Sequence, residues 1–151
     1  MSDYTRALHY AYLLLKYRLR SRYEIVSRLK QKKYSPALIT RVVAYLEQNG
    51  YINDSQFASK YAAALYERGY GKRRVQLTLR RLGVADEDSR IAIARDDERE
   101  RLNELTRRKI TYYQGKKNSA AKVLRSLLAR GFLYHDIMRA MEEQGFNRYE
   151  D

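Results

Sequence analysis

The chain has 151 residues and no cysteine, and its 31 Lys and Arg against 18 Asp and Glu give a formal net charge of +13. The lack of cysteine excludes disulfides and thiol catalysis, and no run approaches the roughly 18 apolar residues of a membrane span. We therefore expect a cytoplasmic protein that does not contact membranes. The positive charge attracts polyanions, so nucleic acid is the first candidate ligand.

Two helices are predicted at the start of the chain. The apolar residues of segment 4–19 fall on one broad helical face. Ser21 and Glu24 have the spacing of a capping box, in which the hydroxyl and the carboxylate each accept a free backbone N–H of the first turn. The second helix should therefore begin at Arg22.

A third helix is marked at both ends. Ser35 followed by Pro36 predicts its start, because proline fits the first helical position without losing a hydrogen bond. Asn49 and Gly50 predict its end, where a left-handed residue closes many helices. Asp54 is then expected to cap the first helix of the next segment.

The same three-helix pattern recurs twice. A shift of about 50 positions places Phe57 on Ala7 and Leu79 on Leu29, and a further shift of about 48 places Leu127 on Leu79. We therefore predict an all-α protein of three tandem three-helix repeats, which form an elongated, curved helical array. The predicted repeats are residues 1–53, 54–97 and 98–151, and the charged span 95–108 is interpreted as a solvated helix between the second and third repeats.

The order and spacing of several short motifs carry a further signal. They are Ser21 with Glu24, Gly50-Tyr51-Ile52-Asn53-Asp54 with Phe57-Ala58, Gly69-Tyr70-Gly71-Lys72-Arg73-Arg74 with Leu79 and Leu82-Gly83-Val84, and Leu128-Ala129-Arg130-Gly131-Phe132 with Tyr134, Asp136 and Ile137. Together these motifs resemble the RecX family, regulators of the bacterial recombinase RecA. The family pattern usually has two acids where this chain has Asn53 and Asp54.

The resemblance implies the same fold of three tandem three-helix repeats and a non-catalytic role. The protein would bind the groove of the RecA–DNA filament and modulate ATP hydrolysis and strand exchange, usually as an inhibitor, in recombination, DNA repair and the SOS response. The implied partners are the RecA filament and single-stranded and double-stranded DNA. We expect a monomer without a cofactor.

Basic clusters supply the candidate contacts with nucleic acid or with the filament. They are Arg18, Arg20, Arg22, Lys72, Arg73, Arg74, Arg80, Arg81, Lys116, Lys117, Lys122, Arg125 and Arg130. The alternative is a solvated face, and we prefer it for Lys30, Lys32 and Lys33, because cations suit the C-terminal end of a helix dipole.

Two of the clusters lie at predicted helix starts, where positive charge is mildly unfavourable. One follows Gly71 and comprises Lys72, Arg73 and Arg74, and the other follows Gly115 and comprises Lys116 and Lys117. Free backbone N–H groups, a glycine that allows close approach and flanking cations together favour an anion site. We therefore hypothesise that each start binds a phosphate or a carboxylate cluster, with simple solvation as the alternative.

Tyrosine is unusually frequent, with 15 copies and no tryptophan. Aromatic faces interleaved with cations are typical of single-strand binding surfaces, and Tyr23, Tyr66 and Tyr70 are the candidates for such contacts. Helix packing is the alternative use of a tyrosine ring. It is our interpretation for Tyr12, Tyr17, Tyr45, Tyr61 and Tyr113.

No residue pattern predicts an enzyme or a metal site. His9 and His135 are the only histidines, and neither has metal-ligand spacing with another ligand. The acidic run 96–98 is interpreted as solvated charge, since adjacent helical residues point in different directions. Two other classes stay open: a helix-turn-helix DNA-binding protein that does not act through RecA, and a ribosome- or RNA-associated helical protein.

The net charge of +13 makes a prediction about salt. If phosphate contacts supply much of the affinity for single-stranded DNA, the logarithm of the binding constant will fall linearly with the logarithm of salt concentration, by roughly 0.7 per neutralised phosphate. Fluorescence anisotropy on a labelled oligonucleotide across a salt series measures this slope. A flat response would instead assign the affinity to contacts with protein.

Overall fold

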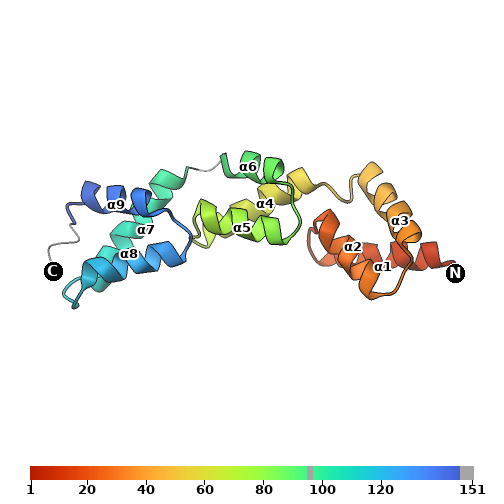
Figure 1. The fold of residues 1–151 in the computed structure, drawn as a ribbon, viewed down its shortest axis with the longest axis horizontal. Helices are drawn as coiled ribbons and strands as arrows, with labels where there is room; N and C mark the ends of the chain where they lie inside the picture. The colour runs from red at the N-terminus through yellow and green to blue at the C-terminus, as the bar shows by residue number, and fades with distance from the viewer. Residues whose placement is uncertain (95–96, 147–151) are drawn as a thin grey trace. The chain divides into compact units, whose positions relative to one another are not determined.

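The structure is a computed structural model that describes residues 1–94 and 97–146. Over those residues the chain forms nine α-helices and no strand (Figure 1). They are α1 (Asp3–Tyr17), α2 (Arg22–Gln31), α3 (Pro36–Gln48), α4 (Asp54–Glu67), α5 (Lys72–Arg81), α6 (Asp86–Ala94), α7 (Glu98–Tyr113), α8 (Ser119–Ala129) and α9 (Tyr134–Glu143). The all-α prediction is therefore confirmed. None of these helices is both long enough and apolar enough to cross a membrane.

The predicted helix boundaries follow from their capping residues. The start of α2 has a complete capping box, in which the Glu24 N–H donates to the Ser21 hydroxyl and the Ser21 N–H donates to the Glu24 carboxylate, each at 3.2 Å. The Ser35 hydroxyl accepts from Leu38 N–H at the start of α3. Both predicted starts are confirmed.

Two predicted boundaries need correction. The cap of α4 is Asn53, whose side chain accepts the Gln56 N–H at 3.0 Å, and not Asp54, which is the first residue of the helix. The charged span at 95–108 does contain a helix, but α7 begins at Glu98 because Asp97 accepts the N–H of Glu100. Residues 95 and 96 lie outside the described part of the chain.

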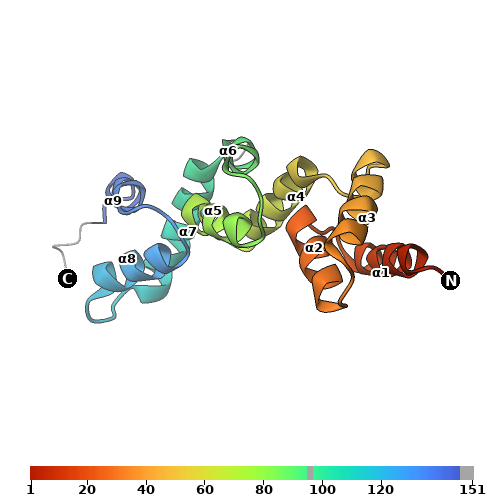
Figure 2. The same ribbon diagram turned by 45° about the vertical axis from the view of Figure 1, so that its right-hand side comes forward.

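The first of two compact units comprises Met1–Tyr61 and Leu79–Ala92. Within it, helices α1, α2 and α3 contact one another, as both views show (Figures 1 and 2). Each helix buries the apolar stripe predicted from its period of 3.6. The buried core of this unit includes Ala7, Ala11, Leu14, Ile25, Leu29, Ile39, Val42, Val43, Leu46 and Ile52.

The second compact unit comprises Ala62–Thr78 and Ile93–Asp151. Helices α7, α8 and α9 contact one another in this unit (Figure 2). Its buried core includes Leu102, Ala120, Val123, Leu127, Phe132, Ile137, Ala140 and Met141. The residues of the predicted second repeat are shared between the two units, so the division into three repeats stays a prediction about sequence periodicity.

The turns that follow α5 and α8 each contain a glycine in a left-handed conformation. Gly83 has φ +77° and a Cβ placed there would lie 2.2 Å from the Cβ of Tyr23 on α2. Gly131 has φ +92°, and its Cβ would lie 2.4 Å from the Cβ of Arg74 on α5. Real Cβ atoms do not approach so closely, so glycine is required at both turns for its conformation and for its size.

This arrangement predicts a stability difference between two glycine variants. Gly83→Ala adds strain at positive φ, about 1–2 kcal/mol, and a clash with Tyr23 that costs a further 1–3 kcal/mol or so. Gly50→Ala has a similar φ of +75° with nothing within 4 Å of the added Cβ, so it should cost only the strain. Urea unfolding of both variants measures the difference, and equal losses would show that Gly83 is not tightly packed.

Candidate partner and nucleic-acid interface

The start of α2 is enclosed by other parts of the first unit. The Arg22 N–H donates to the carboxylate of Asp54 at 2.8 Å, and the buried Ser21 hydroxyl donates to the carbonyl of Leu82 at 2.6 Å. Ser21 therefore has two roles, because the same oxygen also caps its own helix. The first residue of α4 and the turn after α5 together satisfy this helix start.

The start of α5 in the second unit is enclosed in a closely similar way. Gly71 N–H donates to the carbonyl of Arg130 at 2.8 Å, and Arg73 N–H donates to the carbonyl of Gly131 at 3.2 Å. The Lys72 N–H also acts on the carboxylate of Glu98, the first residue of α7, and lowers its pKa. The glycine turn therefore satisfies this helix start, and the acid that opens α7 lies beside it.

These bonds correct the anion site predicted at Gly71. Its backbone N–H groups are not free for a phosphate, because they already donate to the turn at 130–131. A Cβ at Gly71 would lie 2.6 Å from the Gly131 carbonyl oxygen, so Gly71 permits the approach of this chain's own backbone. The sequence indicated a helix start whose N–H groups need an acceptor. In the structure, that acceptor is the chain's own backbone and not a ligand.

The second predicted anion site has a different geometry. Lys116 and Lys117 are exposed and precede α8, which begins at Ser119. Gly115 has φ +78° with no atom within 4 Å of a built Cβ, so the turn is open. Asn118 lies in the left-handed region and makes no side-chain cap. These cations therefore stay available to a ligand.

Burial raises the pKa of the two acids that close the helix starts. Desolvation raises the pKa of Asp54 above 3.8, against the hydrogen bond from Arg22 N–H, which lowers it. Desolvation likewise raises the pKa of Glu98 above 4.5, against the charges of Lys72 and Arg101. Ionising either acid therefore costs more in the folded protein than in the unfolded chain.

The basic cluster at the end of α1 is largely neutralised. Arg18 and Arg20 both form ion pairs with Glu24, and Arg20 also donates to the carbonyl of Leu14. Arg22 donates to Glu47 at 2.7 Å. These contacts support the junction after α1, and they leave less uncompensated charge there than the sequence suggests.

Four other predicted contact residues also have internal partners. Arg130 donates to the carbonyl of Arg68 at 3.0 Å, and Arg74 lies 5.0 Å from the ring centroid of Tyr70. Lys72 lies 4.0 Å from the carboxylate of Asp136. Arg80 lies 3.3 Å from Asp86, but that pair is well exposed and contributes little stability.

The remaining predicted cations are distributed over α5 and α8. Arg73, Arg81 and Arg125 are exposed, whereas Lys122 is half-buried. None of these four forms an ion pair within the part of the chain that the structure describes. Among the predicted contact residues, these four together with Lys116 and Lys117 are the cations freest to meet an anionic partner.

The tyrosine predictions are partly wrong. Tyr66 is buried at 7% exposure, and the ring of Tyr70 is half-buried beside the guanidinium groups of Arg74 and Arg130. Tyr23 is 56% exposed but packs its Cβ against Gly83. Conversely, Tyr17, which we assigned to packing, is 85% exposed because it ends α1.

Tyr12, by contrast, packs as predicted. Its ring meets that of Tyr51 edge to face at a centroid distance of 5.0 Å. The hydrogen bond with Tyr45, followed by burial, raises the pKa of Tyr12 to about 12. Tyr12 thus packs against the first unit's core, while Tyr45 and Tyr51 beside it remain 37% and 48% exposed.

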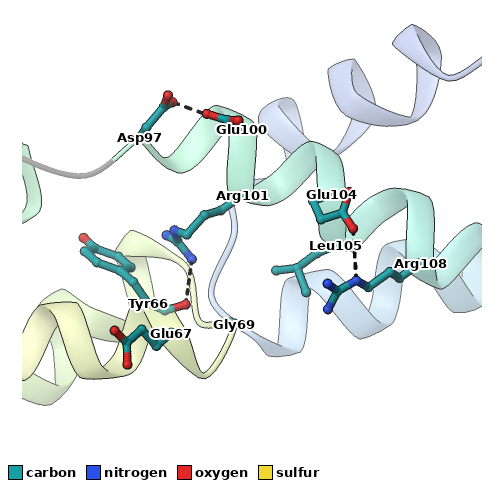
Figure 3. A pocket seen from close by; sticks show the side chains of 9 residues that line it. All are labelled: Tyr66, Glu67, Gly69, Asp97, Glu100, Arg101, Glu104, Leu105 and Arg108. Carbon is teal, nitrogen blue, oxygen red and sulfur yellow. Dashed lines mark hydrogen bonds and ion pairs between the residues drawn. The ribbon is translucent and has the colours of Figure 1, made fainter.

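Sequence reasoning did not single out Arg101, which is central to the second unit. Its guanidinium donates to the carbonyl of Tyr66 and lies 4.2 Å from the Tyr66 ring centroid (Figure 3). The same group donates to the carbonyl of Tyr70 at 2.9 Å. It also borders a pocket of about 470 Å³ whose other lining residues include Glu67, Glu100 and Leu105. Nothing in the sequence distinguishes Arg101 from the other cations of its charged helix.

The structure offers no metal-binding constellation among residues 1–94 and 97–146. His9 and His135 are both exposed. Of the acidic run at 96–98, residue 96 lies outside the described part, Asp97 caps α7 and Glu98 faces the start of α5. The described acids therefore have structural partners.

Comparisons with known proteins identify the family. The model of the first three-helix domain of RecX matches residues 7–46. A protein named Regulatory protein RecX from Mannheimia succiniciproducens is 30% identical over 137 residues, covering 87% of this chain and 90% of its relative. The chain belongs to the RecX family. A RecX from Serratia proteamaculans is 33% identical over 116 residues, covering 72% of this chain and 67% of its own length.

Solved structures of the family agree with the fold. The crystal structure of RecX from Lactobacillus salivarius matches with a TM-score of 0.84 and 25% identity, over 95% of this chain and 97% of that one. A second RecX crystal structure matches with a TM-score of 0.78 at 19% identity. The RecX fold thus extends over nearly the whole chain, and relatives of the chain are named as regulatory proteins.

The raised pKa of Asp54 makes a prediction about pH. Because the folded protein binds this proton more tightly than the unfolded chain, the acid lowers stability progressively as the pH rises from about 3.8 through the folded pKa. Asp54→Asn keeps an oxygen for Arg22 N–H without the charge. Its stability relative to the parent should therefore increase between acid and neutral pH in urea unfolding.

Asp3→Asn is the matched control, because it removes the same charge from an exposed helix start. It should show little of this pH dependence. If Asp54→Asn and Asp3→Asn change stability in parallel across the pH range, burial does not govern the Asp54 carboxyl.

Proposed function

We propose that this protein is a non-catalytic regulator of the RecA recombinase, that it binds the RecA–DNA filament and that it inhibits strand exchange and ATP hydrolysis by RecA. The observation that carries the proposal is family membership over nearly the whole chain, with relatives named Regulatory protein RecX. The net charge of +13 supports it, since a filament contains DNA phosphates.

Among the predicted contact residues, the exposed cations that form no ion pair with a described residue are the preferred contacts in this proposal. They are Arg73, Arg81, Lys116, Lys117 and Arg125. A cation already held by a carboxylate brings less net charge to a partner and must first lose its ion pair. We therefore rank the Arg18, Arg20 and Arg22 cluster, and the internal donors Arg74 and Arg130, below this set as filament contacts.

One comparison tests the proposal against its alternative. Binding is measured at matched salt to RecA-coated single strands, to naked single strands and to naked duplex, together with ATP hydrolysis and strand exchange by RecA. The proposal expects preferential binding to the coated strand and inhibition of both RecA reactions. Equal or stronger binding to naked duplex, without an effect on RecA, would favour a helix-turn-helix type of DNA-binding protein instead.

A charge-reversal pair tests the preferred contacts. Arg73→Glu changes an exposed residue near the start of α5, and Lys60→Glu makes the same charge change at an exposed position of α4 outside the predicted clusters. Arg73→Glu should weaken filament binding severalfold and reduce the salt slope by about 1, whereas Lys60→Glu should change both only slightly. Equal effects of the two variants would mean that total charge alone matters.

A further inference from the structure

The corner between α7 and α8 exposes an aromatic pair. Tyr112 is 64% exposed, and its ring meets that of Tyr113 edge to face at a centroid distance of 4.9 Å. A ring so exposed forgoes most of the stabilisation that burial of a tyrosine provides. Folding alone therefore does not account for an aromatic residue at Tyr112.

A lysine is stacked on the same pair. The ammonium group of Lys116 lies 4.0 Å from the centroid of Tyr112 and 5.6 Å from that of Tyr113. The turn that brings it there is closed by a hydrogen bond from Lys116 N–H to the Tyr113 carbonyl at 3.0 Å. Lys117 is the next residue of the same open turn and is also exposed, so a second cation belongs to the turn that carries the stacked lysine.

This combination differs from the other aromatic residues near cations in the second unit. In the second unit, Tyr66 is buried under Arg101, and Tyr70 is half-buried beside Arg74 and Arg130. Neither Lys116 nor Lys117 forms an ion pair with a described residue. At this corner, an exposed ring thus accompanies cations whose charge is uncompensated.

An unpaired nucleotide has the complementary chemistry. Its base stacks on an aromatic face regardless of sequence, and its phosphate attracts an ammonium group. A duplex offers the phosphate without an accessible base face. We propose that Tyr112, with Lys116 and Lys117, binds one unpaired nucleotide of a single strand, the base on the Tyr112 ring and the adjacent phosphate on the lysines.

This proposal deepens the proposed function and rests on it for the source of the strand, but the test uses bare oligonucleotides. The full chain is titrated against a labelled oligothymidylate and against an abasic strand of equal length and charge. Tyr112→Leu should weaken binding to oligothymidylate about fivefold or more and leave binding to the abasic strand within about twofold. Tyr112→Phe retains the ring and should bind both strands like the parent.

Lys116→Gln provides the complementary variant. It should weaken binding to both strands and lower the salt slope by about one phosphate equivalent, because it removes charge and not the ring. Circular dichroism of each variant verifies that the exposed substitutions leave the helices intact.

Two results would overturn the stacking proposal. If Tyr112→Leu binds oligothymidylate like the parent, the ring makes no contact with the strand. If the variant loses the same affinity for both strands, the ring makes no contact with a base. The RecA assays distinguish this failure from that of the proposed function. If the parent protein inhibits RecA and Tyr112→Leu binds both strands normally, only the stacking site is refuted. If the parent protein does not inhibit RecA and Tyr112→Leu loses binding to oligothymidylate alone, only the regulation of RecA is refuted.

Discussion

The structure depends on how the polar groups at the starts of helices α2 and α5 find their hydrogen-bond partners. Four N–H groups at any helix start need acceptors. The turn at Gly131 accepts the N–H groups of Gly71 and Arg73 at the start of α5, whereas the turn at Gly83 accepts the Ser21 hydroxyl that caps α2. Gly83 reaches the start of α2 and Gly131 the start of α5. The acid at the beginning of α4 accepts a further N–H, and the acid at the beginning of α7 lies beside the start of α5. Close contact with Tyr23 at Gly83 and with Arg74 at Gly131 leaves room for hydrogen only, which explains glycine at both positions.

The cost of this arrangement lies in electrostatics. Asp54 and Glu98 lose hydration when they meet the helix starts, and their pKa values rise despite the favourable N–H groups that they accept. The cations crowded around them offset part of that penalty, as Lys72 and Arg101 do for Glu98. A share of the chain's positive charge is thus used inside the fold. The cations free to meet a partner are correspondingly fewer than composition indicates.

The sequence predicted what depends on neighbours in the chain. Ser21, Glu24 and Pro36 set helix boundaries through local hydrogen bonds and fixed dihedrals, so their roles were readable. Contacts between segments about 60 residues apart were not, since the bond from Ser21 to Leu82 leaves no trace in either segment's composition. The same limit explains Tyr66, whose exposure depends on Arg101 from α7. Local pattern predicts which face is apolar, and not which charged side chain will cover an aromatic ring.

Lys33, in the turn after α2, can be compared with Gly83 in the turn after α5. It occupies the position equivalent to Gly83 after a shift of 50 residues, and it has the same left-handed conformation with φ +68°. Its backbone therefore has the same conformation as the turn at Gly83. A lysine side chain at that turn would occupy the space that Gly83 leaves for Tyr23 at the start of α2. Helices α1–α3 could for this reason not replace α4–α6 unchanged, because a lysine would stand where only a hydrogen fits.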